Sequence, residues 1–339
     1  MKTTDFAESL SNFLKMHLPG QRNVSENTVK SYRDTFKLVL VYAEEKLGIP
    51  SERLSLQQFD CDFVSGFLAW LETDRKNSVS TRNQRLAAIR SFIGYIKNRK
   101  PEYLYQSQQI LAMASLKSPE PMLEYLQPDD IQAILAKPKI STRYGRRDAV
   151  LLSLLYDSAA RVQELADLQV GDVRLVKPYT VILTGKGNKT RAVPLMDATA
   201  ELLKKYVAEN RLDTLEKLGQ PMFCNHQRNI LTRAGIAYIL KKYCDQARSD
   251  RPLIPMRVSP HVLRHSRAMH MLQAGINLIY IRDFLGHAHV TTTEIYARAD
   301  TEMKRAAIES AHIRVEPDLP DWAQDKSLME MLADICGNN

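Results

Sequence analysis

The sequence predicts a mainly α-helical protein of two domains with one small antiparallel β-sheet. Apolar residues recur at helical spacing through most of the 339 residues, whereas one short stretch near the middle is rich in β-branched residues. The periodic pattern lapses between residues 110 and 124, where Pro119 and Pro121 prevent a helix from continuing. Because 44% of the residues are hydrophobic, each domain can form a core of its own.

The first third of the chain predicts a bundle of four helices. Thr4 and Ser25 each precede an apolar stripe, a third stripe covers residues 63–71, and Ser80 is expected to open a fourth helix. The polar side of this fourth helix carries three arginines that could contact phosphates, although a basic face that only meets solvent fits the same pattern. These residues are Arg82, Arg85 and Arg90.

The chain is expected to divide into four segments. Residues 1–112 form the helical domain, residues 113–124 a linker, residues 125–314 a second domain and residues 315–339 a tail. The tail contains six acidic residues and one basic residue, with apolar residues between them. It could dock onto a neighbouring protomer or pack back on its own domain, and its sequence fits both.

The second domain is predicted to contain helices on either side of a β-hairpin. A helix is expected to begin near Pro128, and the apolar segment 149–156 predicts a buried one. Residues 179–184 and 190–195 favour strands, and the glycines of 185–189 predict the turn between them.

Three later helices have recognisable ends. Thr232 is expected to cap a helix, and Gly286 ends a short helix that starts near Asn277. Residues 291–294 have the T-x-x-E spacing of a capping box, so Tyr296 falls within the first turns of a further helix.

One helix is predicted to begin with an unusual group of polar residues. After Ser259 and Pro260, the residues His261, Arg264 and His265 share one face of the first turns. Free N–H groups at this end of a helix attract anions. A metal site would need further ligands nearby and would be opposed by a guanidinium between the histidines, so the pattern favours a phosphate.

Charge and composition narrow the class of partner. Lys and Arg number 47 against 39 Asp and Glu, and the resulting charge of +8 suits a polyanion, although a basic solvated surface has the same composition. No stretch approaches the about 18 continuous apolar residues of a membrane span, and the first residues lack a secretory signal, so we expect a soluble cytoplasmic protein. The four cysteines are too far apart to suggest a disulfide framework or a zinc site.

Together these motifs resemble the signature of the tyrosine recombinase (phage integrase) family, of the Xer-like or mobile-element integrase and transposase type. The signature consists of His261-x-x-Arg264-His265, then Leu285-Gly286-His287, then Tyr296 nine residues after that histidine. Residues 156–165 resemble the family's first arginine motif, and residues 185–189 resemble its lysine-bearing turn. The N-terminal third resembles its core-binding domain. One departure is that Ser158-Ala159 stands where the family usually has Thr-Gly.

The resemblance implies a two-domain DNA clamp, made of a helical SAM-like core-binding domain and a catalytic domain. The implied activity is site-specific cleavage and rejoining of DNA through a 3′-phosphotyrosine intermediate, in integration, excision, transposition or resolution. It implies no cofactor, since exchange of one ester for another requires neither ATP nor a metal. The implied partners are double-stranded DNA with inverted-repeat core sites and further copies of the chain, two on each site and four in synapsis.

The resemblance also assigns roles to individual residues. It makes Tyr296 the nucleophile, Arg161 and Arg264 the phosphate ligands, and Lys186 the acid for the leaving 5′ oxygen. His261 handles protons, His287 donates to the phosphate, and Glu164 and His265 support the site. Each of these residues, taken alone, also has an ordinary structural explanation. DNA contacts are expected from Arg82, Arg85, Arg90, Arg233, Lys241 and Lys242.

Two other functions fit parts of the sequence. A type IB topoisomerase-like enzyme uses similar tyrosine chemistry but religates the same strand; the compact turn at 185–189, the Leu285-Gly286-His287 motif and the tail favour recombination. A catalytically silent DNA-binding protein would not need all six catalytic residues, which are present.

Overall fold

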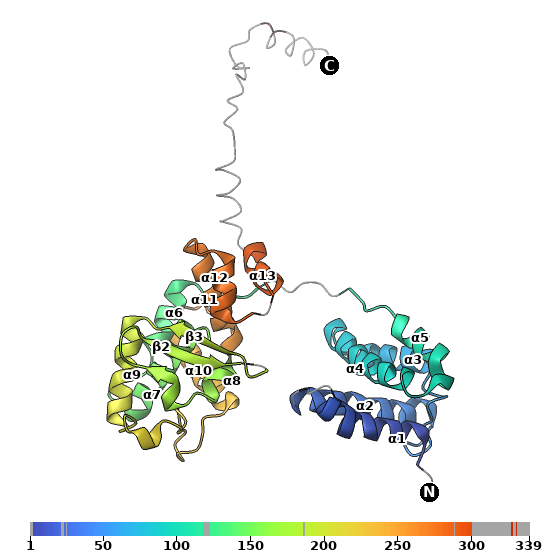
Figure 1. The fold of residues 1–339 in the computed structure, drawn as a ribbon. Coiled ribbons are helices and arrows are strands. Elements are labelled where there is room, and N and C mark those ends of the chain that lie inside the picture. The colour runs from blue at the N-terminus through green and yellow to red at the C-terminus, as the bar shows by residue number, and fades with distance from the viewer. Residues whose placement is uncertain are drawn as a thin grey trace. The chain divides into compact units, whose positions relative to one another are not determined.

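The computed structural model describes residues 3–21, 24, 26–117, 123–185, 187–287 and 289–299, together with Ser327 and Glu330. The chain divides into two compact units, Met1–Pro121 and Met122–Asn339 (Figure 1), and each has a hydrophobic core. The predicted acidic tail, apart from those two residues, and the predicted catalytic Lys186 lie outside the described residues. Within the described ranges, no helix has the length and apolar character needed to cross a bilayer.

The first unit is a helical bundle whose core is rich in phenylalanine. The predicted fourth helix begins at Val79, and Ser78 rather than Ser80 caps it, because the Oγ atom of Ser78 accepts from the Thr81 N–H at 3.3 Å. The sequence did not indicate the π-helical segment η1 or the last helix, α5. The elements are α1 (Asp5–Asn12), η1 (Phe13–Gln21), α2 (Glu26–Leu47), α3 (Cys61–Thr73), α4 (Val79–Lys97), η2 (Pro101–Tyr103) and α5 (Leu104–Ala112).

The second unit surrounds a three-stranded antiparallel sheet with helices. The predicted hairpin is confirmed as β2 and β3, in which Val181 pairs with Val193, and the short β1, which was not predicted, adds to its edge. The elements are α6 (Pro128–Leu135), α7 (Arg143–Asp157), α8 (Val162–Ala166), η3 (Val170–Asp172), β1 (Val173–Arg174), β2 (Thr180–Thr184), β3 (Thr190–Pro194), α9 (Asp197–Glu209), η4 (Leu215–Lys217), α10 (Arg233–Ala247), α11 (Pro260–Gln273), α12 (Leu278–Leu285) and α13 (Thr291–Ala299).

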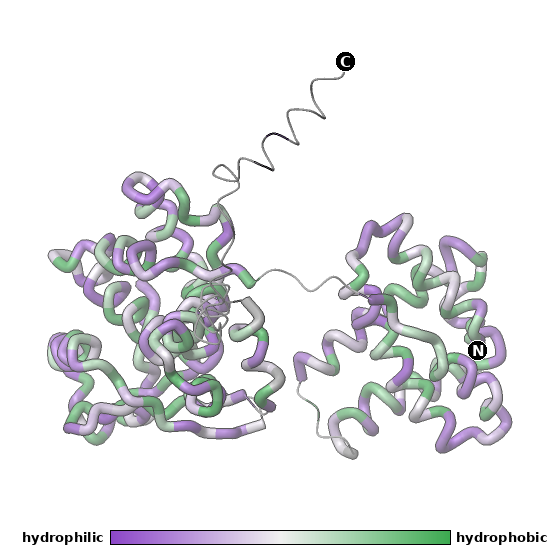
Figure 2. The backbone as a smooth tube through the Cα atoms, turned by 90° about the horizontal axis from the view of Figure 1, so that it is seen from above, coloured by the Kyte–Doolittle hydropathy of each residue, from purple (hydrophilic) through white to green (hydrophobic). Residues whose placement is uncertain are grey.

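The helices of both units are amphipathic. Hydrophilic and hydrophobic residues alternate along the backbone in Figure 2, and in α2 the buried residues Phe36, Val39 and Ala43 recur at helical spacing. The expected caps are present at several ends: the Oγ1 atom of Thr232 accepts from the Gly235 N–H at 3.2 Å, and Asn277 caps α12. At the other end of α12, Gly286 has a φ of +64°, a left-handed conformation that favours glycine.

Several elements far apart in the sequence meet at one end of the second unit. Helix α11 packs against α7, α12 and α13, while α8 packs against β2. A small apolar cluster joins these helices and includes Ala159, Leu285 and Tyr296. The polar residues singled out from the sequence therefore come together around the end of α7, the hairpin and the beginning of α11.

Candidate active site

Arg161 and Glu164 form a fixed pair at the beginning of α8. The backbone N–H of Arg161 donates to one oxygen of the Glu164 carboxylate at 2.8 Å, and its Nη1 atom donates to the other at 2.8 Å. Glu164 is only 4% exposed. Burial alone would raise the pKa of this carboxyl group, but hydrogen bonds from Arg191 and Arg161 hold it at about 2. Glu164 is therefore a carboxylate throughout the physiological pH range.

Arg264 is buried at the same place, with 3% of its surface exposed. Its Nη1 atom donates to the Ala159 carbonyl at 2.6 Å, and its Nη2 atom donates to the Leu285 carbonyl at 2.5 Å. Burial, together with the positive charges of Arg161 and Arg191, lowers the pKa of Arg264 to about 10. The group still carries its charge at neutral pH.

Tyr296 is fully buried, and its hydroxyl lies 3.0 Å from the Nδ1 atom of His265. Burial raises the pKa of Tyr296, while Arg264 and Arg161 oppose that shift. Burial and the neighbouring His261 and Arg264 lower the pKa of His265 to about 4, so this imidazole is neutral at pH 7. The phenol is thus protonated and held by a neutral histidine.

The two histidines of α11 differ in their distance from Tyr296. Family resemblance implies proton handling by His261 and support by His265; in the structure it is His265 that contacts the tyrosine hydroxyl. The His261 ring lies 6.4 Å from the His265 ring and is exposed.

His287 is positioned by the end of α12. The left-handed Gly286 turns the chain so that the Nδ1 atom of His287 lies 3.1 Å from the Oγ1 atom of Thr293. Burial, followed by the charges of Arg264, Arg161 and Arg191, lowers the pKa of His287 to about 4. Thr293 is itself fully buried, and nothing in the sequence singled it out.

A hollow of about 500 Å³ lies beside these residues. Arg161, Lys189, Arg191 and His287 are among its lining residues. Asp283 also lines the hollow, but its single carboxylate is outnumbered by the three cationic side chains, and this excess of positive charge suits an anionic ligand. Among the residues that the structure describes, no group of three or more His, Cys, Asp or Glu side chains could hold a metal ion.

The three arginines of α4 that are predicted to contact DNA each make a hydrogen bond within the first unit, which leaves further N–H donors on Arg85 and Arg90. Arg82 is 9% exposed, and its Nε atom donates to Glu72 at 3.0 Å. Arg85 donates to Thr35 at 3.0 Å, and Arg90 donates to Ser115 at 3.3 Å. Arg82 thus occupies the position of an internal ion-pair partner, because its face of α4 is turned toward α3.

The basic residues of α10 are arranged differently. Arg233, Lys241 and Lys242 are exposed, as a surface that meets DNA requires. Lys242 also lies over the ring of Tyr243, with its Nζ atom 4.7 Å from the ring centre.

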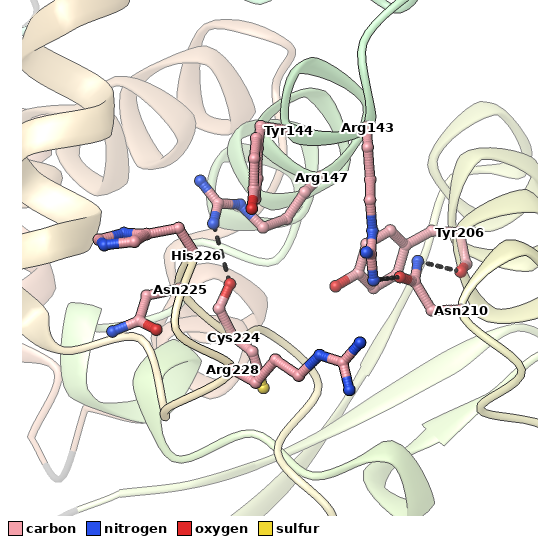
Figure 3. A pocket seen from close by; sticks show the side chains of 9 residues that line it. All are labelled: Arg143, Tyr144, Arg147, Tyr206, Asn210, Cys224, Asn225, His226 and Arg228. Atoms are coloured by element: carbon pink, nitrogen blue, oxygen red, sulfur yellow. Dashed lines mark hydrogen bonds between the residues drawn. The ribbon is translucent and has the colours of Figure 1, made fainter.

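A second cationic pocket, absent from the sequence analysis, lies at the opposite end of α7 (Figure 3). It has a volume of about 80 Å³ and includes Arg143, Arg147 and Arg228 in its lining. Figure 3 shows the Arg147 guanidinium directed at the Cys224 carbonyl, to which it donates at 2.9 Å. Its lining also includes Tyr144, Tyr206 and His226, but the Tyr206 hydroxyl donates to the Met222 carbonyl at 3.2 Å, whereas the Tyr296 hydroxyl of the first site contacts a histidine.

Comparison with known proteins identifies relatives along most of the chain. The model of the phage integrase family matches residues 124–303, and that of the phage integrase N-terminal SAM-like domain matches residues 11–100. The protein y4rC of Sinorhizobium fredii (strain NBRC 101917 / NGR234) is 34% identical over 91% of this chain and 92% of its own length. The tyrosine recombinase XerD of Listeria monocytogenes serotype 4b (strain F2365) is 30% identical over 86% and 93%, respectively.

Two kinds of solved structure have a similar fold. The XerH site-specific recombinase, bound to a palindromic difH substrate after cleavage, gives a TM-score of 0.68 at 24% identity, covering 86% of this chain and 82% of the other. The Tn1549 transposon integrase in complex with transposon right-end DNA gives a TM-score of 0.65 at 17% identity, covering 88% and 98%.

Proposed function

The chain belongs to the phage integrase family, whose tyrosine recombinases cleave and rejoin DNA, and from this premise we propose which residues perform the reaction. The observation that carries the proposal is the contact between the Tyr296 hydroxyl and His265, next to Arg161, Arg264 and Glu164. These groups provide a nucleophile, a proton acceptor and positive charge for one phosphate.

In the proposed cleavage step, the Tyr296 oxygen attacks phosphorus and the bond to the 5′ oxygen breaks. The tyrosyl proton passes to the neutral His265, and the leaving 5′ oxygen takes up a proton, for which family resemblance assigns Lys186. The products are a 3′-phosphotyrosyl link and a free 5′-hydroxyl. A 5′-hydroxyl from another strand then attacks that link and restores the phenol.

The proposed role of Arg161 and Arg264 is to bind the non-bridging oxygens. A guanidinium has five N–H donors, and the hydrogen bonds to Glu164 and to backbone carbonyls occupy only some of them. The remaining donors can meet the charge that develops at phosphorus, and the bonds already made fix their direction. His287, with one N–H on a neutral ring, is the proposed further donor.

The proposed substrate is double-stranded DNA with inverted-repeat core sites, bound by two copies of the chain on each site and four in synapsis. The palindromic substrate of XerH supports this symmetry. Similarity to both Xer recombinases and a transposon integrase supports the general reaction, in which the biological task is integration, excision, transposition or resolution. Because the substrate is DNA, we place the reaction in the cytoplasm.

The test uses a duplex that contains the recognition site and a nick close to the scissile phosphate. Cleavage releases a short oligonucleotide, religation fails, and covalent protein–DNA adduct accumulates on a denaturing gel. We expect an adduct in EDTA, and exchange of strands between two intact sites. Adduct formation without exchange would favour the topoisomerase-like function, and binding without any adduct would contradict the proposal.

A further inference from the structure

Arg191, on β3, makes more contacts with the active-site framework than its place in the sequence suggests. Its Nη1 and Nη2 atoms donate to the two oxygens of Glu164 at 2.9 and 2.8 Å, a bidentate arrangement. Its Nε atom donates to the Phe284 carbonyl at 2.9 Å. One side chain therefore joins the hairpin to α8 and to the end of α12.

The end of α12 is held by three arginines in succession. Carbonyl groups in the last turn of a helix have no partner within the helix and carry partial negative charge. Arg191 binds the Phe284 carbonyl, Arg264 binds the Leu285 carbonyl at 2.5 Å, and Arg161 approaches the Gly286 carbonyl at 3.3 Å. Two of the three arginines are proposed phosphate ligands, whereas Arg191 fixes the turn from its other side.

Close packing places Arg191 against the turn that carries His287. A Cβ atom on Gly286 would lie 3.0 Å from the Cδ atom of Arg191. The turn therefore packs against the aliphatic part of the Arg191 side chain, which is 11% exposed as a whole, while its guanidinium binds Glu164. If Arg191 were shortened, Glu164 would keep only Arg161 as a charged partner, and the α12 end would lose one of its three cations.

We propose that Arg191 is a positioning residue for strand cleavage, which orients Arg161 through Glu164 and His287 through the end of α12. This inference rests on the proposed function. Arg191 contacts the groups that hold the catalytic residues, so it acts on the rate at which bound DNA is cut. Without this bidentate contact, the Glu164 carboxylate that binds Arg161 is no longer fixed by the hairpin, so the direction of the Arg161 guanidinium is no longer set.

The test compares Arg191→Met with a control arginine that has similar contacts elsewhere. Arg248 also binds one carboxylate, Asp245, and two carbonyls, Ile254 at 3.1 Å and Pro255. It lies at the C-terminal end of α10 and is not among the residues that line the hollow. Single-turnover adduct formation at saturating DNA, affinity by gel shift, and thermal unfolding are measured for Arg191→Met, Arg248→Met and the parent. We expect Arg191→Met to lose at least tenfold in cleavage rate with DNA affinity within threefold, while Arg248→Met cleaves bound DNA at the parental rate.

Two further variants separate positioning from a general loss of folding. Arg191→Lys keeps the positive charge but cannot bind both carboxylate oxygens of Glu164 as the planar guanidinium does. We expect this variant to unfold near the parental temperature and to cleave DNA about fivefold more slowly than the parent. Arg191 acts partly through Glu164, so the effects of the two substitutions on the cleavage rate should not be independent. The double variant Arg191→Met/Glu164→Gln should lose less rate than the product of the fold losses in the two single variants.

The outcomes distinguish this inference from the proposed function. If the parent forms no adduct, the proposed function fails. If the parent forms an adduct but Arg191→Lys cleaves at the parental rate, or if the losses of Arg191→Met and Glu164→Gln multiply fully, the positioning role is wrong and the function stands. A loss in Arg248→Met equal to that in Arg191→Met would likewise overturn the inference.

Discussion

The arginines of α4 in the first unit and those around Tyr296 in the second carry the same sequence signal, but their surroundings differ. Arg82 has Glu72 as a partner, so their charges cancel. Arg161 and Arg191 share the single carboxylate of Glu164, and Arg264 has only carbonyl partners. Arg85 and Arg90 donate to hydroxyl groups, so α4 likewise has more cations than acidic partners. What distinguishes the site is that the charges of Arg161 and Arg264 act on Tyr296, and those of all three arginines act on His287.

The largest expected effect comes from the nucleophile. Tyr296→Phe retains the ring that packs among apolar residues and removes only the hydroxyl that contacts His265. We expect the covalent adduct to disappear on the nicked duplex, while gel shifts show nearly unchanged DNA affinity. Adduct formed by the phenylalanine variant would require a different nucleophile and would separate the arginine cluster from the chemistry.

A paired substitution tests the contrast between the two groups of arginines. Arg161→Ala should slow cleavage about 100- to 1000-fold, since loss of one transition-state donor typically costs about 2.7–4 kcal/mol. Arg82→Ala should leave the single-turnover rate at saturating DNA within threefold and act instead on stability, by about 1 kcal/mol, through the loss of its ion pair. Equal rate losses in the two variants would show that a position beside Tyr296 does not mark the catalytic arginines.

The contrast also explains what the sequence could predict. The helical bundle, the hairpin and the ends of α10, α11 and α12 follow from local patterns of apolar, capping and turn residues, and these predictions are confirmed. The burial of Arg82 was not visible, because its partner lies on another helix. Arg191 was missed for the same reason: Glu164 and Phe284 approach it only after the hairpin, α8 and α12 have packed together.

Residue roles depend on finer geometry than element positions do. The motif places His261 and His265 on one face of a helix, and the pattern alone does not decide which of them reaches the tyrosine. The choice depends on how α13 packs on α11, and in the structure His265 makes the contact. The departure at Ala159 was visible in the sequence, but its consequence was not: this residue has a φ of +46°.

A smaller effect is expected from a change in pH, which should alter the stability of the second unit through its buried histidines. In the folded chain, His265 and His287 have pKa values lowered to about 4. As the pH falls below 6.5, these histidines therefore bind protons in the unfolded chain before they do so in the folded chain, which favours unfolding. We expect the free energy of unfolding to fall between pH 7 and pH 5 by about 2 kcal/mol for each histidine. Urea unfolding of the full chain measures this, with His265→Asn as the control.

The histidine control makes the pH prediction specific. Removing one titrating group should reduce the loss of stability between pH 7 and pH 5, even if the variant is less stable at both. The carboxylate of Glu164, with a pKa held at about 2, contributes its stabilisation throughout this range and does not confound the measurement. A variant with an undiminished pH dependence would show that the buried histidine is not its source.

The smallest expected effect concerns two neighbouring alanines, both fully buried, at the end of α7. Ala159 has a positive φ, a conformation that costs a non-glycine residue about 1–2 kcal/mol of stability. Ala160 has no positive φ and so carries no such strain. Each change to glycine removes a buried methyl group, worth about 0.8 kcal/mol, and increases the freedom of the unfolded chain by a further 0.5–1 kcal/mol or so. At Ala159 these losses are offset by the release of strain; at Ala160 they are not.

Urea unfolding of the full chain should therefore place Ala159→Gly near the parent and Ala160→Gly about 1–2 kcal/mol below it. The carbonyl of residue 159 remains in the glycine variant and still accepts from Arg264, so its cleavage rate should stay within about twofold of the parent. Equal destabilisation by both changes would mean that the left-handed turn stores no strain. In that case, the glycine that the family usually has at this position would need an explanation other than backbone conformation.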